Sequence, residues 1–217
     1  MIPSDVLSRV RDQLVETTAA FWSDAELYRY MTDAEREINN QVHCYVLSTA
    51  ATSVTSTSGY TLPVDVLYLD RVSFDNVPLK EVPRRGIDMM DMPGYGGTPQ
   101  TGDPTHYYRQ GTDTVYLWPT PQRAATIQYV YTAEPAAIVT ASTQFSVPAN
   151  FHQPLQDYVL YRSFTKDQDQ ARSEWHKREY MQGVADAEFR ESRRRWSGGF
   201  PEVMDADKAY STFNGVV

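Results

Sequence analysis

The chain has 217 residues, of which 41% are hydrophobic and 22% charged, as is typical of a folded globular protein of about one domain. Its net charge of −8 argues against a protein that grips nucleic acid through overall charge. Apolar runs are far shorter than the roughly 20 residues of a spanning helix, and the N-terminal stretch lacks the apolar core of a secretory signal. We therefore expect no membrane partner and a protein that stays where it is made. Cys44 is the only cysteine, which excludes an intramolecular disulfide and a Cys-based zinc site.

The first 50 residues predict two amphipathic helices. Val6, Val10 and Leu14 recur at helical spacing and indicate a helix over about residues 4–16. Ser23 and Glu26 have the spacing of a capping box, in which each side chain bonds the backbone N–H of the other. A longer helix follows to about residue 48, and its apolar face is formed by Leu27, Met31, Ala34, Ile38 and Val42.

From Thr49 to Pro148 the composition changes to Ser, Thr, Val and Tyr with frequent turn residues, which is typical of strands. Asp75 and Asn76 predict a tight turn after a central strand. Residues 89–104, rich in Gly and Pro, predict a long loop. Several short antiparallel strands suggest a small sandwich or barrel. The candidate strands are residues 51–55, 59–62, 66–74, 77–82, 105–110, 114–118, 126–131 and 144–147.

Helical periodicity resumes near Phe151, and residues 167–169 mark a turn into a second helix that ends at Arg193–Arg195. That helix carries Ala171, Trp175, Met181, Ala185 and Phe189 as its apolar positions. We therefore predict an α+β fold in which a helical bundle, residues 1–50 plus 149–196, carries an inserted antiparallel β-sandwich or barrel, residues 51–148. Residues 197–217 have little apolar periodicity and are interpreted as an extended C-terminal tail.

Motifs for catalysis and ligand binding are missing from the sequence. It contains no phosphate loop, no dinucleotide fingerprint and no G-x-S-x-G elbow. The four histidines lie on different predicted elements without metal-site spacing, so we expect no metal and no cofactor. The carboxylate pairs stand two positions apart on predicted helices, where side chains do not face each other, and we expect them on solvated faces. These pairs are Asp24/Glu26, Glu35/Glu37 and Asp186/Glu188.

A basic cluster closes the last predicted helix. Arg193, Arg194 and Arg195, with Trp196 beside them, either complement the dipole at the helix end or bind an acidic partner. Residues 1–50, 51–148, 149–196 and 197–217 carry net charges of −4, −3, +1 and −2, so this helix end is basic in an otherwise acidic chain. That segregation suits association between copies as well as a plain solvated patch.

Aromatic residues are abundant in the β-rich part. They suit a carbohydrate platform or a protein interface, although cross-strand pairs and core packing account for more than half of them. The residues concerned are Tyr95, Tyr107, Tyr108, Tyr116, Trp118, Tyr129 and Tyr131.

The order of several short stretches resembles the head-to-tail adaptor, or head-completion, proteins of tailed bacteriophages. Each stretch is degenerate alone, but their order and spacing over about residues 4–165 are fairly specific. They are FWSDAEL (21–27), AEREIN (34–39), YTLPVDVL (60–67), VPLKEV (77–82), GDPTHYY (102–108), VYLWPTP (115–121) and VPANFH (147–152).

This resemblance implies a non-enzymatic structural protein of the virion, found at the head-tail junction and made in the host cytoplasm. It implies an adaptor ring, typically a dodecamer, that joins the portal protein to tail or nozzle proteins and continues the DNA channel, through which DNA passes in packaging and ejection without specific binding. The tail then becomes a docking arm for the portal or a neighbouring subunit, about 60–70 Å long at full stretch. Its expected anchors are Trp196, Phe200, Tyr210 and Phe213, beside the arginines 193–195.

Three alternatives stay open at this point. The chain suits a tail-side neck or gatekeeper ring as well as a portal adaptor. The Tyr and Trp set is compatible with a β-sandwich carbohydrate-binding module. A hydrolase acting on glycosides or peptidoglycan through Asp and Glu pairs has the weakest support, since nothing in the sequence brings two carboxylates to one cleft.

Overall fold

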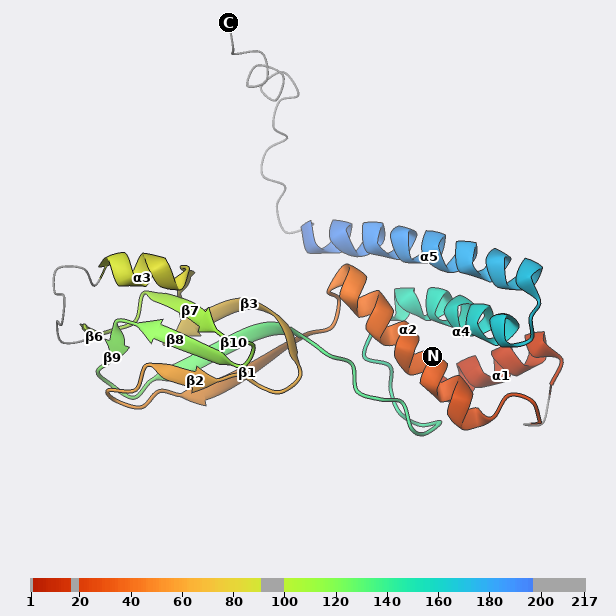
Figure 1. Ribbon diagram of the computed structural model, residues 1–217, viewed down its shortest axis with the longest axis horizontal. Coiled ribbons are helices and arrows are strands. Elements are labelled where there is room, and N and C mark those ends of the chain that lie inside the picture. Colours follow the sequence, from red (N-terminus) through yellow and green to blue (C-terminus); the bar gives the residue numbers. More distant parts are fainter. Residues whose placement is uncertain (1, 17–19, 91–99, 197–217) are drawn as a thin grey trace, which may run out of the picture.

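The structure is a computed structural model that describes residues 2–16, 20–90 and 100–196. It confirms the α+β class, with five α-helices and ten short strands among those residues. Figure 1 shows an elongated molecule with four helices at one end and the strands, accompanied by α3, at the other. We call these ends the helical unit, residues 2–44 and 135–196, and the β unit, residues 45–134. Each has its own cluster of buried apolar side chains.

The helical unit is built around α4, which packs against α1, α2 and α5. Its bounds are α1 Pro3–Leu14, α2 Asp24–Val42, the short 3₁₀ helix η1 Ala149–Phe151, α4 His152–Lys166 and α5 Gln170–Trp196. The predicted apolar faces of the first two helices are buried, with Val6, Val10 and Leu27 fully inaccessible to solvent. The helix hairpin predicted around residues 167–169 is confirmed.

The start of α2 differs in one respect from the predicted capping box. The Ser23 side chain accepts a hydrogen bond from the Glu26 backbone N–H at 3.2 Å, as predicted. The Glu26 carboxylate, however, binds Lys166 Nζ at 2.6 Å and accepts from the Tyr30 hydroxyl at 2.8 Å. It therefore fastens α2 to the end of α4. The helix ends at Val42, before the predicted residue 48, because His43 adopts the left-handed conformation with φ 52°.

The β unit contains three small sheets, and none of them closes into a barrel. Strand orders are β1-β10-β3-β4, β2-β8-β7-β5 and β6-β9, with parallel pairing only at β5–β7 and β6–β9. The bounds are β1 Val46–Thr52, β2 Gly59–Thr61, β3 Val66–Phe74, β4 Val77–Pro78, β5 Lys80–Glu81, α3 Arg84–Met90, β6 Thr101–Gly102, β7 His106–Gln110, β8 Thr114–Trp118, β9 Thr120–Pro121 and β10 Thr126–Ala133.

The strand predictions were most accurate at the centre of the sheets. Residues 66–74 and 114–118 match β3 and β8, and Asp75 and Asn76 form the predicted turn with φ of 50° and 66°. The strand expected at 51–55 instead begins at Val46. Residues 144–147 form no strand, because Ser146 and Val147 donate their backbone N–H groups to the Glu35 carboxylate.

Two further segments also depart from the prediction. Residues 77–82 split into β4 and β5, which pair in different sheets. The segment expected to be a loop from residue 89 begins inside α3 and includes the short strand β6; its residues 91–99 lie outside the described part.

One asparagine joins the two units. The Asn39 side chain, fully buried at the end of α2, donates to the Ala133 carbonyl at 2.9 Å and accepts from the Tyr45 N–H at 2.9 Å. Tyr45 precedes β1 and Ala133 ends β10, so the amide holds both crossings of the chain between the units. Figure 1 shows these crossings running side by side.

Candidate interaction surfaces

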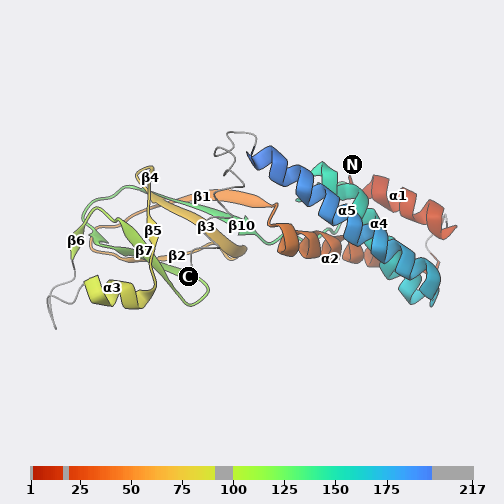
Figure 2. The ribbon, with the colours of Figure 1, turned by 90° about the horizontal axis from the view of Figure 1, so that it is seen from above.

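The long helix α5 forms one outer side of the helical unit, as Figure 2 shows. Its inner face is formed by small, polar and aromatic side chains, of which Tyr180, Val184 and Ala187 join the core. Gly183 makes the close approach to α4 possible, since a Cβ there would lie 2.9 Å from Pro154 Cγ. The helix pair is therefore closely packed along much of its length.

The outer face of α5 carries the large apolar residues that the sequence suggested as its apolar positions. Trp175 is 50% exposed, and Met181 and Phe189 are each 60% exposed. The apolar positions that the sequence suggested for this helix therefore do not face the core. Apolar residues occupy more than one face of α5, and the face with Tyr180, Val184 and Ala187 is buried, while Ala171 and Ala185 are exposed together with the large residues. Trp175 and Phe189 are four helical turns apart on one exposed side, which suits contact with another protein.

A groove beside Trp175 contains the only paired histidine and aspartate of the described residues. His176 Nδ1 lies 3.2 Å from Asp157 Oδ1, and both side chains are buried between α4 and α5. Burial raises the pKa of Asp157, while hydrogen bonds from Gln153 and His176 lower it. The His176 ring stacks on Phe164 at 5.5 Å. The groove, of about 580 Å³, is also lined by Val15 at the end of α1, so its rim is partly apolar.

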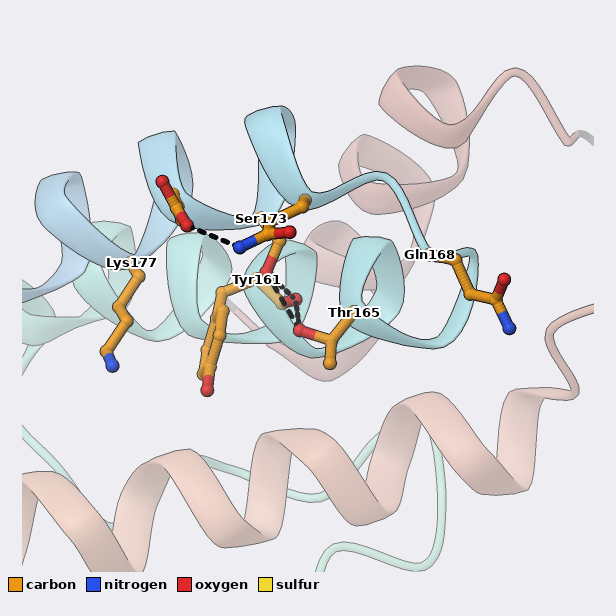
Figure 3. Close-up of a pocket in the computed structure, with 7 residues that line it drawn as sticks. Tyr161, Thr165, Gln168, Ser173 and Lys177 are labelled. Atoms are coloured by element: carbon orange, nitrogen blue, oxygen red, sulfur yellow. Dashed lines mark hydrogen bonds between the residues drawn. The ribbon is translucent and has the colours of Figure 1, made fainter.

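A second hollow of about 430 Å³ lies at the turn between α4 and α5, and Figure 3 shows its lining. Thr165 Oγ1 donates to the Tyr161 carbonyl at 2.7 Å and lies 2.8 Å from Ser173 Oγ. The Lys177 ammonium lies 5.8 Å from the centre of the Tyr161 ring. These hydroxyls bond the backbone and each other, which secures the hairpin and brings no acid-base pair together.

Three carboxylates of the pairs named in the sequence analysis make structural contacts, whereas Glu37, Asp186 and Glu188 are exposed as predicted. Asp24 pairs with Arg11, and Glu26 binds Lys166. Glu35 was expected on a solvated face and is instead fully buried, because its carboxylate caps the N–H groups of Ser146 and Val147 at 2.6 and 3.2 Å. Burial outweighs these bonds and raises its pKa to about 6.

Most aromatic residues of the β unit serve packing. Tyr107, Tyr129 and Tyr131 are buried in its core. Tyr108 and Tyr116 are direct cross-strand partners whose rings stack at 5.1 Å. Trp118 contacts the ring of His106, while Tyr95 lies outside the described residues. The core and cross-strand explanation therefore covers most of the set.

The predicted partner-binding residues are placed only in part. Arg193, Arg194, Arg195 and Trp196 form the last turn of α5, whose side chains lie outside the described structure. Phe200, Tyr210 and Phe213 lie outside the described residues altogether. The role of all seven in binding stays a prediction.

Across residues 2–16, 20–90 and 100–196, no three His, Cys, Asp or Glu side chains gather in a way that would hold a metal ion. None of the helices in this part of the chain has the length and apolarity needed to span a bilayer.

In this part of the molecule, charged groups fasten helices together, and large apolar side chains are exposed on one long helix. A family model described as SU10 adaptor protein matches residues 1–202, and the chain belongs to this family. It is thus a structural adaptor protein of a bacteriophage virion, and the family resemblance predicted from the sequence is confirmed. No curated protein matches the chain.

Proposed function

We propose that the chain assembles as an adaptor ring, typically of twelve copies, which joins the portal protein to the tail or nozzle and continues the DNA channel. The observation that carries this proposal is the family match over residues 1–202. In the proposed subunit, a helical bundle contacts its neighbours and the portal, and an inserted pair of packed sheets extends from it.

The exposed face of α5 supports association of subunits. Trp175 and Phe189 offer aromatic anchors of the kind that dominate protein interfaces. The helix ends in the three consecutive arginines 193–195, and the remainder of the chain is acidic. The basic end would therefore attract an acidic surface of the portal or of the next copy, with residues 197–217 continuing from it as a docking arm.

The net charge of −8 supports a channel that lets DNA pass. Acidic walls repel phosphates, so they impose no sequence-specific or tight contact that would stop a moving duplex. We propose that DNA is conducted in this way during packaging and ejection and is not bound.

Native mass spectrometry tests this function. The full chain is measured alone and mixed with the portal protein encoded in the same genome. We expect a small species alone and a ring-sized mass on the portal. If the chain does not bind the portal but forms rings on a tail protein, it belongs to the tail-side neck. If it binds neither, the adaptor ring is refuted.

A charge-reversal variant tests the basic helix end. Replacing Arg193, Arg194 and Arg195 with Glu is expected to weaken ring formation on the portal strongly. The control replaces Arg84 and Arg85, two exposed arginines of α3 in the β unit, with Glu. If both variants lose assembly equally, net charge governs association and the assigned role of the helix end is wrong.

A further inference from the structure

Strand β1 forms an open edge of its sheet. It is seven residues long and pairs only with β10 in the sheet order β1-β10-β3-β4. Figure 2 shows it at the rim of the β unit. An edge strand presents a row of unpaired N–H and C=O groups to any extended chain that approaches it.

The register shows which backbone groups point outward. Ala133 N–H donates to the Tyr45 carbonyl, and Ser53 N–H donates to the Ala125 carbonyl, so the odd-numbered residues of this strand bond to β10. Residues 46, 48, 50 and 52 therefore direct their N–H and C=O groups away from the sheet. No other described segment forms a backbone hydrogen bond with these four residues.

The other edge strands of the two large sheets are short, and the part of β3 that β4 leaves uncovered carries the charged residues Asp70 and Arg71. β4 has two residues and contains Pro78, β5 consists of the exposed charged pair Lys80 and Glu81, and β2 has three residues. Short length, proline and charge are the usual means of preventing strand addition. β1, with the sequence VLSTAAT, has none of them, and its outward side chains are small or uncharged. Among the edge strands of the two large sheets, β1 is therefore the one best suited to strand addition.

The C-terminal residues of the chain fit this edge. Residues 208–217, KAYSTFNGVV, contain a single charged side chain and are rich in the β-formers Tyr, Thr, Phe and Val. The eleven residues 197–207 that connect them to α5 span about 36–40 Å when extended. A ring of identical subunits needs two different complementary surfaces on each copy, and an arm with a strand edge is such a pair.

We propose that residues 208–217 of one copy add as a strand to the β1 edge of the next copy. This inference rests on the proposed ring and identifies one contact within it. Backbone hydrogen bonds supply the affinity, as in other cases of strand addition. The side chains that become buried determine which residues of the two strands lie opposite each other.

Cross-linking between differently labelled copies tests the proposal. The full chain with Cys44→Ser receives either Ser48→Cys, in heavy-isotope form, or Ser211→Cys, in light form. The two are mixed, assembled on the portal and treated with a short thiol cross-linker. Heavy–light dimers are expected.

Other products would overturn the proposal. Dimers of Ser48→Cys alone would indicate pairing of two β1 strands. A third protein carries both Ser48→Cys and Ser211→Cys, and an intramolecular link in it would indicate that the arm binds its own chain. Ring-sized masses without heavy–light links would refute the arm contact while leaving the adaptor ring intact. Absence of rings would refute the ring itself.

A proline variant tests the hydrogen bonds. Ala50→Pro removes one outward N–H and leaves the bonds to β10, because proline is tolerated on an edge strand when its nitrogen faces outward. The heavy–light yield is expected to fall about fivefold to tenfold, the effect of losing one hydrogen bond. The control Ala50→Val keeps the N–H and is expected to retain the yield. Equal yields in both variants would contradict strand addition at this edge.

Discussion

Both units have an apolar core, but they differ in the polar groups that they bury. Among the described residues, the buried charged and imidazole side chains all lie in the helical unit, including Arg11, Glu35 and Asp157. The buried polar residues of the β unit are Ser53, Ser73 and Thr132. The helical unit thus adds a few specific polar contacts to its apolar core, whereas the core of the β unit is aromatic and aliphatic with few polar groups. The comparison teaches that the helical unit should be sensitive at single residues and the β unit more tolerant.

The largest effect is expected at Arg11. Its buried guanidinium pairs with Asp24 and with Glu16 at 3.6 Å, and it donates to the Trp22 carbonyl at 3.0 Å. Arg11→Met should lower the free energy of unfolding by about 3 kcal/mol, because the buried Trp22 carbonyl loses its charged donor. Urea unfolding followed by helical circular dichroism measures the loss. Arg9→Met, at an exposed position of the same helix, is the control, and equal losses would contradict the assignment.

The second effect depends on pH. Burial raises the pKa of Glu35 from 4.5 to about 6, so the folded chain binds this proton more tightly than the unfolded chain. Its contribution to stability is fully present below the unfolded value and is lost as pH rises through the folded value. The loss amounts to about 2 kcal/mol.

Substitution by glutamine isolates this contribution. The stability of the native chain relative to Glu35→Gln should fall by about 2 kcal/mol between about pH 4 and pH 7.5. Thermal or urea unfolding at both pH values gives the difference. Glu37→Gln, exposed on the same helix, should show no such trend. If the difference in unfolding free energy between the native chain and Glu35→Gln does not change with pH, the Glu35 carboxylate is better solvated than its position indicates.

A smaller effect is expected in the β unit at the stacked pair Tyr108 and Tyr116, whose ring centres lie 5.1 Å apart. A double-mutant cycle with alanine should give a coupling free energy of about 1 kcal/mol, which is typical of an aromatic pair. The four proteins of the cycle are compared by urea unfolding. A coupling near zero would show that the pair merely covers the surface of the sheet.

The smallest effect is expected at Arg123. It pairs with Asp75 and Asp103, each at 2.9 Å, but its side chain is 49% exposed. Arg123→Ala should cost the least stability of these variants, and salt should reduce this cost further because water and ions screen exposed pairs. Unfolding in low and high salt measures both. A loss as large as that of Arg11→Met would remove the contrast between the two units.

The sequence predicted best those elements whose signal is local. The cap at Ser23, the turn at Asp75 and Asn76 and the continuous strand over 66–74 each depend on neighbouring residues. The buried face of α5 could not be predicted from spacing, because apolar residues stand on more than one side of the helix. Which face is buried depends on how closely α4 can approach at Gly183, and this is a property of the tertiary structure.

The interaction surfaces were predictable only in part. The family resemblance depended on the order of short motifs and needed no tertiary information. The burial of Glu35 could not be foreseen, since its partners Ser146 and Val147 are more than a hundred residues away. The open edge of β1 required knowledge of strand order, although the uncharged stretch 46–52 was a visible signal.

The pairing of Val46 with Thr132 has a consequence for how this chain can change over evolution. The β unit leaves the helical unit and returns to it at adjacent points, both held by Asn39. An inserted module with neighbouring ends adds little strain to its host, whatever its size. The β unit can therefore be lengthened or shortened while the helices keep their packing, so that the size of one half of the molecule can change without disturbing the other.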